Sequence, residues 1–245
     1  EDRDLTAWFL LDLSGSVDFG SADVTKLAVA TAFVATLARV LTRHGNRVGA
    51  LLYDRKVDTM LPPGGTRLHV LNLLTRMRAR RRAPAPGAAT ALAELIHAGA
   101  RTIRRRSLVF VVSDFISTPG WDDALAQLAQ RHEVVAVRLF DPLEMALPEI
   151  GLVTVEDAET GEQLFVDSAD PAFRARYHAI AQAREAALRE ALARSGADTL
   201  ELATDDDLLD ALLRFADLRR QRARLKAPGR FPAHLRAPAA AGASS

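Results

Sequence analysis

The residues best suited to chemistry come directly after an apolar run near the start of the chain. Trp8 to Leu11 are followed by Asp12, and the hydroxyls of Ser14 and Ser16 follow on alternate residues. An apolar run that stops at turn-forming residues is typical of a buried strand leading into a loop, so the strand would deliver Asp12 to its carboxyl end. One carboxylate and two hydroxyls are hard oxygen ligands, and such a set favours a small divalent cation.

A second carboxylate and a third hydroxyl fall at comparable places further along the chain. Residues 108–112, LVFVV, are the most apolar and β-branched run, and they end at Ser113 and Asp114. Thr90 opens an expected helix, where its side chain could also cap the backbone N–H of a residue in the first turn. If the strands before Asp12 and Asp114 are neighbours, all these oxygens lie on the same rim of a sheet.

The elements that must position these residues alternate between strand and helix. Expected strands cover 8–11, 47–53, 56–61, 108–112, 133–139 and 199–202, and expected helices cover about 24–43, 68–77, 90–105, 121–131, 170–194 and 205–222. The link between the second and third strands is too short for a crossover, so these two must pair antiparallel. We predict a doubly wound α/β fold with a mostly parallel six-stranded sheet in the order 3-2-1-4-5-6, strand 3 at the edge, and helices on both faces.

Two further segments complete the expected organisation. Residues 152–167 read as an inserted β-hairpin, because two β-rich runs flank a turn that contains Gly161. One domain is expected over residues 1–222, and the tail over 223–245 is expected to be disordered because it has little core-forming content.

Composition limits the function classes. The chain has 245 residues, no cysteine and a formal net charge of +1. The absence of cysteine excludes disulfides and thiolate metal sites, and the near-zero charge argues against a nucleic-acid partner. The basic run Arg104–Arg106 has no interleaved aromatic residues, so we expect it to be solvated. No apolar run is long enough to cross a membrane, so we expect a cytoplasmic domain, although a longer parent protein could be membrane-associated.

With these residues assigned, a resemblance to a known family becomes specific. The run DLSGS, a threonine loop and SDF resemble the metal-ion-dependent adhesion site (MIDAS) of von Willebrand factor type A domains. Over Leu5 to Arg219 the chain is similar to a bacterial family of uncharacterised von Willebrand A-like proteins, often encoded beside MoxR-type AAA+ ATPases. The similar runs include RVGALLYD, LPPGGTR, VVSDF and EVVAVRLFDPLE. The family's upstream β-rich segment is not in this sequence, which is therefore expected to be a fragment of a longer protein.

The resemblance implies a Mg²⁺ site, with Mn²⁺ or Ca²⁺ as other candidate ions. Its pattern falls on Asp12, Ser14, Ser16, Thr90 and Asp114. The threonine loop here is GAAT, where the family more often has a second glycine, and Thr66 in PPGGT is a rival for the position of Thr90. In adhesion-type domains an acidic side chain of a protein partner completes the metal shell. The resemblance therefore implies an interaction domain that works with a MoxR-type AAA+ ATPase in protein maturation or complex assembly.

Two other functions are compatible with the same residues. A Mg²⁺- or Mn²⁺-dependent hydrolase of phosphate esters could use Asp12 and Asp114 as ligands, and a scaffold could keep the site vacant. A haloacid-dehalogenase-like phosphatase is disfavoured because its second aspartate would fall on Ser14. The nucleotide-binding motif GxxxxGK[ST] is absent. We expect a domain that is not itself an enzyme.

Overall fold

A computed structural model describes residues 6–20, 24–79, 90–156 and 163–226. The chain divides into two units, Glu1–Leu208 and Leu209–Ser245. The second unit contains most of helix α6 (Leu208–Lys226). The last part of the expected tail, 227–245, lies outside the described residues, as does the turn of the hairpin at 157–162.

The first unit is built on a six-stranded sheet in the order β3-β2-β1-β4-β5-β8. The strands are β1 (Thr6–Asp12), β2 (Arg47–Tyr53), β3 (Val57–Gly64), β4 (Leu108–Ser113), β5 (Glu133–Phe140) and β8 (Asp198–Ala203). All neighbours pair parallel except β2 and β3. This confirms the predicted order, the antiparallel edge strand and the doubly wound α/β fold class. Strand β3 runs past its expected end through Pro62 and Pro63, which an edge strand tolerates because one side of it needs no donors.

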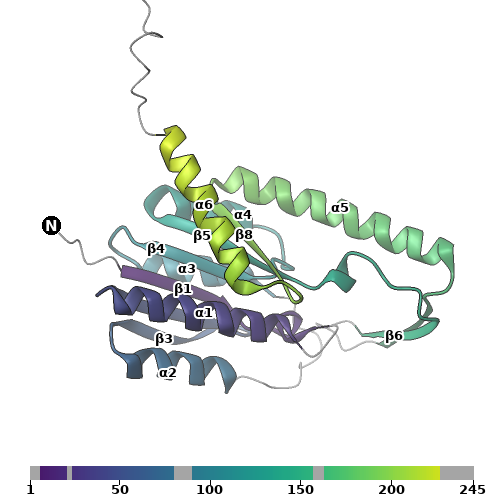
Figure 1. The fold of residues 1–245 in the computed structure, drawn as a ribbon, viewed down its shortest axis with the longest axis horizontal. Coiled ribbons are helices and arrows are strands. Elements are labelled where there is room, and N and C mark those ends of the chain that lie inside the picture. Colours follow the sequence, from purple (N-terminus) through teal and green to yellow (C-terminus); the bar gives the residue numbers. More distant parts are fainter. Residues whose placement is uncertain (1–5, 21–23, 80–89, 157–162, 227–245) are drawn as a thin grey trace, which may run out of the picture. The chain divides into compact units, whose positions relative to one another are not determined.

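Helices cover both faces of this sheet (Figure 1). They are α1 (Lys26–Arg43), α2 (Arg67–Arg78), α3 (Leu92–Thr102), α4 (Trp121–Arg131) and α5 (Pro171–Ser195), with short 3-10 turns η1 (Gly15–Asp18) and η2 (Pro142–Glu144). Figure 1 shows α1 and α2 on the near side and α3 and α4 on the far side. The predicted hairpin is confirmed as β6 (Leu152–Glu156) and β7 (Gln163–Asp167), which pair antiparallel.

Alternate residues of the central strands supply the two cores. On one face, Phe9 of β1 stacks on Phe110 of β4 with ring centroids 5.2 Å apart, and Phe33 of α1 meets both rings edge-on. On the other face, Trp8 and Leu10 of β1 join the buried cluster formed with α3, α4 and α5. Because side chains alternate along a strand, burial on both faces gives the continuous apolar run that the sequence shows.

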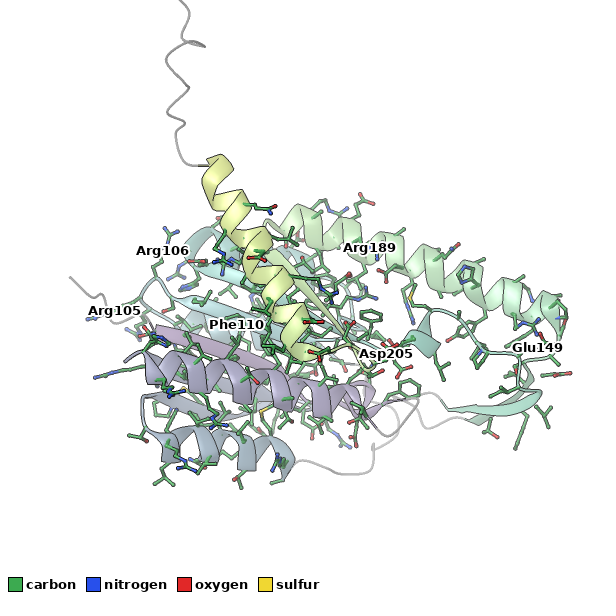
Figure 2. All side chains as sticks on the ribbon, in the orientation of Figure 1. Arg105, Arg106, Phe110, Glu149, Arg189 and Asp205 are labelled. Atoms are coloured by element: carbon green, nitrogen blue, oxygen red, sulfur yellow. The ribbon has the colours of Figure 1, made fainter. Side chains whose placement is uncertain are left out.

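A clamp of buried charges holds α5 against the sheet. Arg138 of β5 forms a two-pronged pair with Glu185 of α5 and also donates to Glu201 of β8 at 2.9 Å. Arg138 and Glu185 are both buried, so loss of either one would leave a buried charge without its main partner. The basic run Arg104–Arg106 is exposed, as expected, and precedes β4 (Figure 2 labels Arg105 and Arg106). It therefore lies at the amino-terminal ends of the parallel strands, opposite the carboxyl ends that carry Asp12 and Asp114.

Candidate functional site

The candidate site lies where the strand order of the sheet reverses. Strands β1 and β4 are parallel neighbours, with Leu11 opposite Val112, so Asp12 ends one strand as Asp114 follows the other. Chain connections leave this point in opposite directions, toward β2 on one side and β5 on the other. Ligands bind in open α/β sheets at this kind of crevice.

Asp12 is held by hydrogen bonds from the loop that follows β1 and from the neighbouring strand β4. Its side chain is fully buried; one oxygen accepts from the Ser14 backbone N–H at 3.0 Å, and the other accepts from the Ser113 hydroxyl at 2.7 Å. Burial, followed by the negative charge of Asp114, raises the pKa of Asp12 to about 6, although the bonds from Ser113 and Ser14 oppose this change. Asp12 and Asp114 are therefore close enough to repel each other in a poorly solvated place.

The two serines turn into the same space because η1 begins directly after Ser14. Their hydroxyl oxygens lie 3.3 Å apart, and both side chains are buried. The Val17 backbone N–H donates to the Ser14 carbonyl at 3.0 Å and fixes the turn. Two hydroxyls with converging lone pairs beside a carboxylate form an oxygen-only donor set.

Thr90 lies at the same end of the sheet, where it and its neighbour Ala91 form hydrogen bonds with the loop after β4 and with the end of β2. Its carbonyl accepts from the Ser117 hydroxyl and from the Thr118 backbone N–H, both at 2.9 Å. The next residue, Ala91, donates its N–H to the Tyr53 hydroxyl at 2.9 Å. Thr90 is buried here, between the loops that follow β2 and β4.

Thr90 does not cap the following helix, which corrects one expectation. Helix α3 begins at Leu92, Ala91 is its N-cap, and the Leu92 backbone N–H donates to Ser117 at 2.9 Å. The rival Thr66 is exposed and caps α2 by accepting from the His69 N–H at 3.1 Å. Thr66 follows the end of β3, where Gly64 pairs with Val48 near the start of β2. Thr66 therefore lies at the end of the sheet opposite Asp12.

Asp114 is held through both of its carboxylate oxygens. One of its oxygens accepts from the Ile116 backbone N–H at 3.0 Å, and the other pairs with the Lys26 ammonium at 2.8 Å. The next residue, Phe115, has a φ of 59°, a left-handed conformation that costs a bulky residue about 1–2 kcal/mol. Packing of its buried ring against Trp121, with ring centroids 5.0 Å apart, stabilises this turn of the backbone.

Sequence reasoning missed three residues that shape the site: Ser113, Lys26 and Glu144. Lys26 is almost completely buried and joins Asp114 to Glu144 of η2, whose oxygen is 2.6 Å from the ammonium. Burial opposes its charge, but the charges of Asp114 and Glu144 outweigh this and raise the pKa of Lys26. One sequence signal was available, since nearly every other basic residue of the chain is arginine.

The arrangement fits a small divalent cation. Two buried carboxylates repel each other beside the buried hydroxyls of Ser14 and Ser16, Thr90 is buried in the neighbouring loop, and the Lys26 ammonium already pairs with the Asp114 carboxylate. Within the described ranges no three His, Cys, Asp or Glu side chains form a group that could hold a metal. The candidate set differs in kind from such a group, because it combines two carboxylates with hydroxyls.

The amino-acid sequence matches a known protein family. The model of the family "Protein of unknown function DUF58" matches residues 1–187. An uncharacterized protein of Mycobacterium tuberculosis is 36% identical over 220 residues, which cover 90% of this chain and 69% of that protein.

Solved structures agree in fold. An aerotolerance-related membrane protein from Bacteroides fragilis has a TM-score of 0.60 at 15% identity, over 89% of this chain and 99% of that one. The conserved hypothetical protein BatB from Bacteroides thetaiotaomicron has a TM-score of 0.57 at 15% identity, with the same shares covered. Among the helices of the described residues, none is long and apolar enough to cross a membrane. With a family model that spans most of its length, the chain belongs to the family of proteins of unknown function DUF58.

Proposed function

We propose that this chain is a protein-interaction domain that uses a bound Mg²⁺ ion to recognise an acidic group of a protein partner. Asp12, Ser14, Ser16, Thr90 and Asp114 are the residues that would hold the ion. When bound, Mg²⁺ supplies a coordination position for a carboxylate oxygen, because Mg²⁺ in proteins takes few protein ligands and fills its other positions with water. The observation that carries the proposal is the meeting of Asp12 and Asp114, from distant parts of the chain, beside two converging hydroxyls.

The residues of the site would divide the work between them. Asp12 brings negative charge, while Ser113 and the Ser14 N–H fix its orientation. Ser14 and Ser16 offer neutral oxygens, so the two aspartates alone would balance the charge of a divalent ion. An open coordination position on the ion would still favour a carboxylate oxygen over a neutral group, because a cation binds an anionic ligand more strongly. No residue of the set needs to act as a nucleophile, and we propose a domain without catalytic activity of its own.

The partner forms a further part of the proposal. A MoxR-type AAA+ ATPase, or a protein on which it acts, is the proposed source of the acidic group, and its support is the family resemblance. Because such an ATPase consumes ATP, we also propose that the domain acts in the cytoplasm, in protein maturation or complex assembly. A pull-down with wild type and Asp12→Asn protein, with and without Mg²⁺, tests this part. Equal capture of the ATPase by both proteins would count against it.

Thermal melting with Mg²⁺, Mn²⁺ or a chelator tests the cation site. A ligand that binds only the native state raises the melting temperature, so wild type should melt higher with either ion and Asp12→Asn should not respond. Asp18→Asn is the matched control, since Asp18 is an exposed carboxylate of η1 and its loss should leave the response intact. Absence of any shift in wild type would indicate a scaffold with a vacant site. Mg²⁺-dependent turnover of phosphate esters that Asp12→Asn abolishes would instead favour a hydrolase.

A further inference from the structure

Lys26 is a charged residue inside the core that the family pattern of the site does not explain. It is the first residue of α1, its side chain is 1% exposed, and its backbone N–H donates to the Phe19 carbonyl at 2.9 Å. An ammonium removed from water is costly unless carboxylates surround it. Here Asp114 lies 2.8 Å away and Glu144 2.6 Å away.

The ammonium occupies an oxygen of Asp114 that the cation site would share. The other oxygen of Asp114 accepts from the Ile116 N–H, so the protein already engages both sides of this carboxylate. Asp12 has no comparable cationic partner among its hydrogen bonds, which come from Ser14 and Ser113. A divalent ion that approaches Asp114 therefore meets the positive charge of the Lys26 ammonium. Two positive charges that share one buried carboxylate repel each other strongly, because little water is present to screen them.

We infer that Lys26 is a built-in competitor of the divalent cation for Asp114 and thereby sets the cation affinity of the site. The inference rests on the proposed cation site. Direct contact with the ion then falls to Asp12, Ser14 and Ser16, while Asp114 is shared between the ion and the ammonium. A site of this kind has a lower affinity than its oxygen ligands alone would give.

Glu144 makes the competition adjustable. It lies in η2, its side chain is 15% exposed, and it gives Lys26 a second carboxylate when the ion draws on Asp114. The segment is tied to α5, since the Tyr177 hydroxyl donates to the carbonyl of the neighbouring Leu143 at 2.9 Å. A partner that pulls η2 away from Lys26 would return the ammonium fully to Asp114 and weaken cation binding. Lys26 thus links the site to the segment between β5 and α5.

Mn²⁺ binding to the full chain, followed by the electron paramagnetic resonance of free Mn²⁺, tests the inference. Lys26→Gln keeps a hydrogen-bond donor for Asp114 but removes the charge, and it should bind Mn²⁺ at least tenfold more tightly than wild type. Glu144→Gln leaves Lys26 with Asp114 alone and should bind at least threefold more weakly. Lys56→Met removes an equal charge from an exposed lysine and should stay within twofold of wild type.

The outcomes separate this inference from the proposed function. Equal Mn²⁺ affinity of wild type and Lys26→Gln would overturn the role of Lys26 and leave the cation site standing. Binding by Lys26→Gln alone would support the competition and overturn cation-dependent docking by the natural protein. Binding by neither would overturn both. Should Lys26→Gln fail to fold, the Glu144→Gln result decides, and an affinity equal to or above that of wild type would refute the inference.

Discussion

The buried carboxylate of Asp12 should make the cation-free protein less stable as the pH rises toward neutrality. Burial and Asp114 raise the pKa of Asp12 from an ordinary value of 3.8 to about 6. The folded state therefore binds more protons than the unfolded chain between these values. The stability that this proton contributes is fully present below the unfolded-state pKa and is lost as the pH rises through the folded-state pKa.

The size of the effect follows from the difference between the two pKa values. About two pH units correspond to about 3 kcal/mol of unfolding free energy, of which about 2 kcal/mol should be lost between pH 4.5 and 7.5. Asp12→Asn keeps the shape of the side chain but cannot ionise, so its stability should not show this loss. The measurement is urea unfolding of both proteins across this pH range with a chelator present. The difference in stability between wild type and Asp12→Asn should grow in favour of wild type as the pH falls.

Added Mg²⁺ supplies a second check on the same carboxylate. At pH 7.5 the ion should restore stability to wild type, because ionised Asp12 is the form that binds a cation. At pH 4.5 the protonated carboxyl should bind it poorly, and the stabilisation should be much smaller. Parallel pH profiles of wild type and Asp12→Asn without metal would refute the reasoning, since they would show that Asp12 titrates alike in the folded and unfolded states.

Two further predictions concern groups away from the site. Within the described residues both ring nitrogens of buried His132 lack a hydrogen-bond partner, and burial, with Arg131 and Arg106 adding to it, lowers its pKa. The protein should therefore lose stability as the pH falls below about 6.5, and urea unfolding of His132→Leu should show less of this loss; an unchanged pH profile would count against it. Arg138→Met should lower the unfolding free energy in urea by about 3 kcal/mol, because it leaves buried Glu185 without its main partner. This is the low end of the range for breaking a buried ion pair, since Arg189 still pairs with Glu185 at 2.8 Å. Adding Glu185→Leu should recover much of that loss, and no recovery would disprove the pairing.

Much of the fold could be predicted because local patterns and chain connectivity leave few alternatives. The apolar runs that end at Asp12 and Ser113 are typical of buried strands, and the short link before β3 required antiparallel pairing with β2. With the alternation of strands and helices, these patterns indicate a doubly wound sheet; the order within it is a further hypothesis, which the structure confirms. The predicted start of α3 was less accurate, because Ser117, a residue from another loop, accepts from the Leu92 N–H, one of the two groups that Thr90 could have capped.

The candidate site also has one part that local sequence could predict and another that depends on contacts between distant residues. The sequence by itself determined which oxygens stand at the ends of β1 and β4, since residue type and spacing are properties of the chain. Only the tertiary structure decided which charges surround them. Lys26 is 88 residues from Asp114 and 118 residues from Glu144 in the chain, and no local pattern records such contacts. The physical reason is that a buried charge is stabilised by whatever folding brings within a few ångströms, and that neighbourhood is set by the packing of whole elements.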